Sequence, residues 1–171
     1  MSDIGSRIEG SKNWLERAAE HIPGYRGYKQ KELRREADKL QREYVAERLE
    51  SARRALERLA LTLTNQGDLA LLAPLDTAGR RLRTVKDKIL YADYGCAGLF
   101  DTVKVDEDVL DRLYQFDVRS QEEARGIEDL VAAMSAASPS LRSDIDLLDR
   151  RITALDQFFA DREHLVTGVG R

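Results

Sequence analysis

The chain contains few of the residues that interrupt or cross-link a fold. Its 171 residues include one cysteine, three prolines and 11 glycines, and only 6% are aromatic. A single cysteine forms no internal disulfide and supplies no multi-cysteine metal site. The scarcity of proline and glycine argues against β-sandwiches and doubly wound sheets, which need frequent turns. What is present is 42% apolar and 35% charged, a mixture typical of long amphipathic helices.

Long apolar runs are also missing. The most apolar segment, Leu69-Ala-Leu-Leu-Ala-Pro-Leu75, is far shorter than the roughly 20 residues that cross a bilayer. The opening residues, Met1-Ser-Asp-Ile-Gly-Ser-Arg7, do not resemble a secretory signal. The sequence therefore predicts a single-domain cytoplasmic protein.

Apolar residues recur every three or four positions along most of the chain, which predicts helices. The expected helices cover residues 11–21, 28–66, 69–92 (or 74–92), 106–134 and 139–166. Gly67 suits a left-handed C-cap, and Asp68 an N-cap for the next helix. Ser138 followed by Pro139 suits an N-cap with proline at the first helical position.

Three of these helices keep heptad spacing over several repeats, which favours knobs-into-holes packing. The predicted fold is all-α: an elongated antiparallel bundle of two long coiled-coil-like hairpins, 28–92 and 105–166, plus a short N-terminal helix and Pro-Gly turn in residues 1–27. Residues 167–171 form a tail. The predicted buried residues are Leu56, Leu59, Leu82, Val85, Leu113, Ile127, Leu148 and Ile152. The seam of the third long helix, residues 106–134, has a polar middle at Ser120 and Glu123.

Charge is divided unevenly between the two hairpins. Residues 26–100 hold 16 Lys or Arg against 11 Asp or Glu, whereas residues 101–171 hold 9 against 16. Two interpretations stay open. Either the charges fix the pairing of the hairpins within one molecule, or the acidic face of one copy meets the basic face of the next.

No catalytic constellation is present, so the sequence predicts no enzyme, no metal and no cofactor. A di-iron bundle site needs two Glu-x-x-His motifs, but the only histidines are His21 and His164. A nucleophilic Cys96 would need a base brought to it from His21 or His164, and a small buried thiol is the favoured interpretation. The glycine-rich loops that bind phosphates are absent.

The sequence argues against nucleic acid as a partner. Basic residues cluster at 26–35 and 80–88, and Tyr25 and Tyr28 lie beside the first cluster. Lysines and arginines with interleaved aromatics can bind phosphates and bases. However, the chain is acidic overall, and Glu32, Glu36 and Asp38 interrupt the first cluster.

A membrane surface is the alternative partner. Trp14, Leu15 and Ile22 precede basic residues, as in an interfacial anchor. A short amphipathic helix before a long hairpin, over residues 1–92, resembles the architecture of the phage-shock and vesicle-inducing membrane-remodelling proteins. Pro23-Gly24 and the tyrosine pair depart from that family. The other interpretation is that Trp14 and Ile22 cap the end of the bundle.

Two irregular segments, 23–28 and 91–101, should face the same end of the bundle. The helix over 28–66 outlasts its partner by about 15 residues, so its start needs cover from residues 1–27, from the 91–105 loop or from another chain. The segments supply either an aromatic plug for the bundle or a surface for a partner. The candidate interaction residues are Tyr25, Arg26, Tyr28, Tyr91, Asp93, Tyr94, Phe100 and Asp101.

Two sequence segments resemble those of bacterial all-helical proteins, a resemblance that implies the fold and no activity. They are Ile22-Pro-Gly-Tyr-Arg-Gly-Tyr-Lys-Gln-Lys-Glu32 and Tyr94-Gly-Cys-Ala-Gly-Leu-Phe-Asp101. Taken together, the sequence predicts a non-enzymatic helical scaffold or adaptor that binds a protein partner or itself. Peripheral membrane binding is the alternative function.

Overall fold

The computed structural model describes residues 25–92 and 107–168, with side chains from 39 to 92 and from 115 to 162. These residues form four helices and no strand: α2 (Tyr25–Gln66), α3 (Leu72–Leu90), α5 (Glu107–Ala133) and α6 (Leu141–Gly168). The prediction of an all-α bundle is confirmed. The helix expected over 11–21 and the tail over 169–171 lie outside the described residues.

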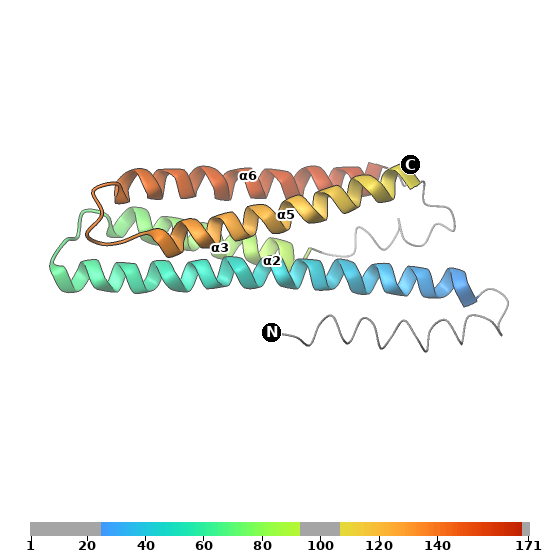
Figure 1. Ribbon diagram of the computed structural model, residues 1–171, viewed down its shortest axis with the longest axis horizontal. Coiled ribbons are helices and arrows are strands. Elements are labelled where there is room, and N and C mark those ends of the chain that lie inside the picture. The colour runs from blue at the N-terminus through green and yellow to red at the C-terminus, as the bar shows by residue number, and fades with distance from the viewer. Residues whose placement is uncertain (1–24, 93–106, 169–171) are drawn as a thin grey trace.

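The four helices form a bundle in which α2 and α6 lie at opposite corners (Figure 1). Helix α2 packs on α3 and α5, and α6 packs on the same two helices from the other side. Hydrogen bonds from Arg42 to Leu90 and from Lys86 to Glu50 make α3 antiparallel to α2. In contrast, contacts between α2 and α5 keep a nearly constant separation of 79 to 81 residues, so these two helices run parallel.

The core is an apolar column along the inner faces of all four helices. Its members include Val45, Leu49, Leu82, Ile127 and Leu148, each almost fully buried. Burying such a side chain contributes about 1.5–3 kcal/mol, so the column is the main source of stability. Six of the residues predicted to be buried are buried in the structure: Leu56, Leu82, Val85, Ile127, Leu148 and Ile152. Leu59 is only partly buried, and the side chain of Leu113 lies outside the described residues.

Two details of the predicted stripes are wrong. Apolar spacing at the start of α2 predicts a stripe through Leu33, Ala37, Leu40 and Tyr44, but Leu40 is exposed and the buried residues there are Gln41 and Val45. In α5 the core passes through Ala124 and not through Glu123, which is half-buried. In both cases the true stripe lies one position away from the predicted one, which turns it by about 100° around the helix.

The turn between α2 and α3 is built as the sequence predicts. Gly67 adopts a φ of 75°, the left-handed conformation that glycine reaches without strain. The amide of Asp68 donates to the Leu63 carbonyl at 3.0 Å, and the amide of Gly67 donates to the Thr64 carbonyl at 3.0 Å. This pair of bonds is a Schellman motif, which satisfies carbonyls that the end of the helix leaves open.

Other helix starts differ from the prediction. Helix α2 begins at Tyr25 rather than 28, and α3 begins at Leu72 rather than 69 or 74. Pro74 is therefore the third residue of α3, where its missing N–H is no loss because first-turn amides have no intrahelical partner. Asp68 does not cap α3; its carboxylate accepts a bond from the Ala70 amide instead.

Helix α6 begins at Leu141, two residues after the predicted start at Pro139, although the Ser138 side chain makes the bond expected of an N-cap. The Ser138 hydroxyl accepts a bond from the Ser140 amide at 3.3 Å, and the Ser140 hydroxyl donates to Asp144 at 2.8 Å. Serine side chains that bond to the nearby backbone compete with the helix, which explains the later start.

Candidate functional site

The candidate interaction residues lie only partly within the described part of the chain. Tyr25, Arg26 and Tyr28 lie in the first turns of α2, where the backbone alone is described. Tyr91 is the C-cap of α3 and is 74% exposed. The remaining predicted residues lie outside the described part of the chain: Asp93, Tyr94, Phe100 and Asp101.

Helix α3 ends well before the start of α2. Arg42 donates to the carbonyls of Leu90 and Ala92 at 3.3 and 3.0 Å, which fixes the end of α3 beside Arg42. Tyr25 lies about 17 residues earlier, which is roughly 25 Å along the helix. The helices therefore do not bring Tyr91 next to Tyr25, and the predicted meeting of the two segments depends on residues outside the described ranges.

The predicted membrane contacts, Trp14, Leu15 and Ile22, also lie outside the described residues. None of the described helices is both long and apolar enough to span a membrane.

A buried polar layer crosses the bundle near the level at which α3 ends. Its buried members are Gln41 of α2, Ser120 of α5 and Arg162 of α6, which are 7%, 1% and 8% exposed. The Gln41 amide donates to the Asp117 carbonyl at 2.7 Å and to the Ser120 hydroxyl at 2.9 Å. Gln121 donates to the Gln41 side-chain oxygen. We call these residues, Gln41, Asp117, Ser120, Gln121 and Arg162, the polar layer.

Arg162 joins the polar layer to α6. Its guanidinium lies 3.3 Å from the Asp117 carboxylate. Nearby, the rings of Phe116 and Phe158 are 4.5 Å apart, and Arg119 covers Phe158 at 5.1 Å. The polar groups thus bind one another across three helices, the arrangement by which bundles fix one register.

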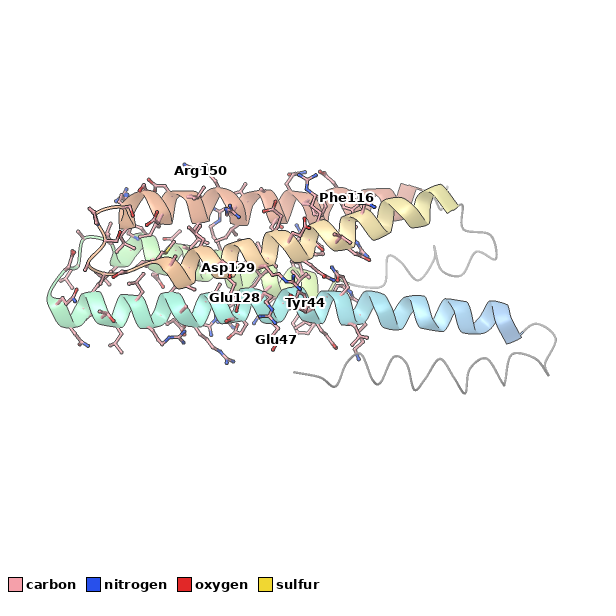
Figure 2. All side chains as sticks on the ribbon, in the orientation of Figure 1. Tyr44, Glu47, Phe116, Glu128, Asp129 and Arg150 are labelled. Carbon is pink, nitrogen blue, oxygen red and sulfur yellow. The ribbon has the colours of Figure 1, made fainter. Side chains whose placement is uncertain are left out.

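A second cluster lies between α2 and α5 around Tyr44. Arg125 donates to the Tyr44 hydroxyl at 2.5 Å, and Arg48 lies 5.0 Å from the Tyr44 ring centre. Arg48 also binds Glu128 at 3.1 Å. Burial raises the pKa of Glu128, but hydrogen bonds from Ser51 and Arg48 outweigh it and lower that pKa overall. Figure 2 shows Tyr44 and Glu128 between the two helices.

The basic cluster on α3 is neutralised by carboxylates. Arg81 and Lys88 bind Asp149 and Asp156 of α6, the second pair at 2.6 Å. The remaining pairs lie on α3 or reach α2: Arg80–Asp76 at 3.0 Å, Arg83–Asp87 at 3.7 Å and Lys86–Glu50 at 3.2 Å. The five cations lie beside five carboxylates, so the cluster has no excess of positive charge to attract phosphates.

The ion pairs between the hairpins share one polarity. In Arg48–Glu128, Arg81–Asp149 and Lys88–Asp156 the base belongs to the first hairpin and the acid to the second. This arrangement supports the interpretation that the charge division guides pairing within one molecule. Each exposed pair stabilises by only about 0–1 kcal/mol, so these pairs contribute more to register than to stability.

Glu50 is the most strongly perturbed acid of the described surface. Arg53 donates two hydrogen bonds to it, at 2.7 and 3.1 Å, and Lys86 donates one at 3.2 Å. The bonds from Arg53, together with those from Lys86, lower the pKa of Glu50 to about 2. Its partners tie α3 to α2, so this carboxylate is a structural anchor.

The described residues show no metal-ligand cluster, and they form at least two surface hollows. They contain no group of three or more His, Cys, Asp or Glu side chains that could hold a metal. A groove of about 550 Å³ lies between α2 and α5, lined mainly by small side chains such as Ala52, Ala55 and Ala132. A hollow of about 450 Å³ lies over Glu47, Glu50, Ser51, Arg54 and Arg58 on α2 alone.

Sequence reasoning missed most of the polar layer. Ser120 was expected in the seam, but Gln41 and Arg162 were not. A signal existed: Gln41 precedes Val45 by four residues, and Arg162 follows Leu155 by seven, so both continue the core stripes of their helices.

Comparison of the chain with protein-family models, with curated proteins and with solved structures found no match.

Proposed function

We propose that the chain is a non-enzymatic helical scaffold that acts by binding protein, including a second copy of itself. The observation that carries this proposal is that the buried polar side chains of Gln41, Ser120 and Arg162 bind neighbouring residues across the bundle. A bundle whose polar interior is used for its own packing offers its exterior for function.

Exposed apolar side chains on the first hairpin favour a protein as the partner. Large apolar side chains are exposed there: Leu40, Leu61, Leu69 and Tyr91, at 40, 61, 62 and 74%. On a surface otherwise rich in charge, leucine and tyrosine provide the apolar area that protein contacts bury.

A membrane surface is supported less well. Interfacial helices present a strongly basic face to anionic lipid. The exposed face of α2 carries Glu43 and Glu47 as well as Arg54 and Arg58, so half of its charges would repel such a surface.

Sedimentation velocity of the full chain tests the proposal. We expect a dimer or larger species at low salt that dissociates as the ionic strength rises past about 0.1 M, where the screening length falls to about 10 Å. Co-sedimentation with vesicles containing anionic lipid is the parallel measurement. A monomer at all salt and protein concentrations, or vesicle binding without self-association, contradicts the scaffold proposal.

A further inference from the structure

The outward face of α2 carries a regular stripe of exposed residues. Spacings of three or four place them on one side of the helix, away from the buried Val45, Leu49 and Leu56. We call this set the outer stripe: Leu40, Glu43, Glu47, Ser51, Arg54, Arg58 and Leu61. Figure 2 shows Glu47 on the side of α2 opposite the α2–α5 interface.

The outer stripe is symmetric about the point between Glu50 and Ser51, so that it complements a second copy of itself. Leu40 and Leu61 are equally distant from this point, at the two ends. Glu43 is matched by Arg58, and Glu47 is matched by Arg54. A second α2 laid antiparallel on this face therefore places leucine opposite leucine and each acid opposite a base.

Heptad spacing adds to this match. Leu40, Glu47, Arg54 and Leu61 follow one another every seven residues, which is the repeat that keeps one seam facing a partner helix. In a parallel pair the same seam would place Glu47 against Glu47 and Arg54 against Arg54. The charge order therefore favours the antiparallel pair over the parallel one.

The charges of the outer stripe are largely available for a partner. Glu47 and Arg58 make no salt bridge within the part of the chain that the structure describes. Arg54 binds Glu50 at 3.2 Å but stays 66% exposed. Glu43 lies 3.7 Å from Lys39, and both side chains are open to solvent.

The middle of the outer stripe has room for close approach. Ser51 is small; its hydroxyl bonds to Glu128 of α5, and it also borders the hollow of about 450 Å³ that Glu47, Glu50, Arg54 and Arg58 surround. A small residue at a helix crossing lets two backbones come near, while the longer side chains around it interdigitate.

We propose that a second copy of this chain docks antiparallel on the outer stripe, with a two-fold axis between Glu50 and Ser51. This inference rests on the proposed self-association and names its surface. The contact is one helix wide, so it belongs to the small and transient class of interfaces. Its ion pairs, Glu43 with the partner's Arg58 and Glu47 with the partner's Arg54, make it sensitive to salt.

Charge reversal tests the pairing. Glu47→Arg or Arg54→Glu alone places like charges together at two equivalent points of the dimer. We expect each to raise the dimer dissociation constant about tenfold or more. The double variant Glu47→Arg with Arg54→Glu restores opposite charges, so its dissociation constant should return to near that of the natural chain.

Arg142→Glu is the matched control, because Arg142 is an exposed arginine on α6 that also pairs with an acid one turn away. It should leave the dissociation constant unchanged. Far-ultraviolet circular dichroism establishes that all variants keep their helix content.

Cross-linking tests the direction. Leu40→Cys and Leu61→Cys are made separately in a Cys96→Ala background, and a short bismaleimide is added. In the antiparallel dimer, residue 40 lies opposite residue 61 of the partner, so a mixture of the two variants should cross-link. Leu40→Cys alone should not, because its two copies are roughly 30 Å apart. Efficient cross-linking of Leu40→Cys with itself overturns the antiparallel arrangement.

The two levels of the proposal fail in different ways. If the natural chain associates and the single reversals associate equally well, the outer stripe is not the interface but the scaffold proposal stands. If the natural chain and all variants are monomers, both proposals are overturned.

Discussion

Gln41 is the member of the polar layer that α2 contributes, and removing its side chain should destabilise the protein. In Gln41→Ala, the bonds to the Asp117 carbonyl at 2.7 Å and to the Ser120 hydroxyl at 2.9 Å are lost, as is the bond from Gln121. A net hydrogen bond contributes about 0.5–1.5 kcal/mol, and leaving a buried group without its partner costs about 1–3 kcal/mol. We expect a loss of about 2–4 kcal/mol in the free energy of unfolding.

Urea denaturation followed by far-ultraviolet circular dichroism measures this loss, at one protein concentration because association shifts apparent stability. Gln157→Ala is the matched control. Gln157 also donates a hydrogen bond, to Asp161 at 2.9 Å, but it is exposed on α6. Its loss should be within about 0.5 kcal/mol.

The double variant Gln41→Leu with Ser120→Ala distinguishes the cost of leaving a buried polar group unpaired from the stability that the hydrogen bonds contribute. It replaces the two hydrogen-bonding partners by apolar groups, and such a replacement is often nearly neutral or stabilising. We expect it to recover most of the stability lost in Gln41→Ala. Equal small losses for Gln41→Ala and Gln157→Ala would refute the buried, cooperative character of the polar layer.

Two further predictions concern an acid and the core. The pKa of Glu50 is lowered to about 2 from an ordinary value of 4.5, so its contribution is present above pH 4.5 and is lost as the pH falls toward 2. Glu50→Gln should remove about 1–3 kcal/mol at neutral pH and flatten the acid limb of the stability curve, as urea titrations across this range would show. Leu148→Ala should cost about 2–5 kcal/mol because Leu148 is fully buried, whereas Leu147→Ala, at its exposed neighbour, should cost far less; equal costs in thermal melts would contradict the core assignment.

The helices were predictable because their periodicity is strong. The buried residues of α3, for example, follow steps of three and four that only a helix places on one face: Leu75, Ala78, Leu82, Val85 and Ile89. Gly67 was predictable as well, since a left-handed C-cap leaves little choice of residue. The start of α6 was not, because Ser138 and Ser140 offer the backbone local bonds of comparable strength, and tertiary packing decides between them.

The candidate site was less accessible to sequence reasoning than the fold. Gln41, Ser120 and Arg162 are far apart in sequence and meet only because α2 and α5 run parallel while α6 returns beside α5. Local pattern specifies which face a residue takes, but it does not specify which helices become neighbours. The pairing of Arg81 and Lys88 with α6 was hidden for the same reason, so charge counts alone left two interpretations open.

The parallel packing of α2 and α5 also bears on how the chain folds. Contacts within each hairpin join residues tens of positions apart, whereas Gln41 and Ser120 are separated by 79 residues and Arg81 and Asp149 by 68. Closing such long loops costs entropy before the contacts form, and folding slows as the mean separation of contacts grows. We therefore expect the two hairpins to form early and separately, and their docking through the polar layer and the Arg81–Asp149 pair to be the late, slow step.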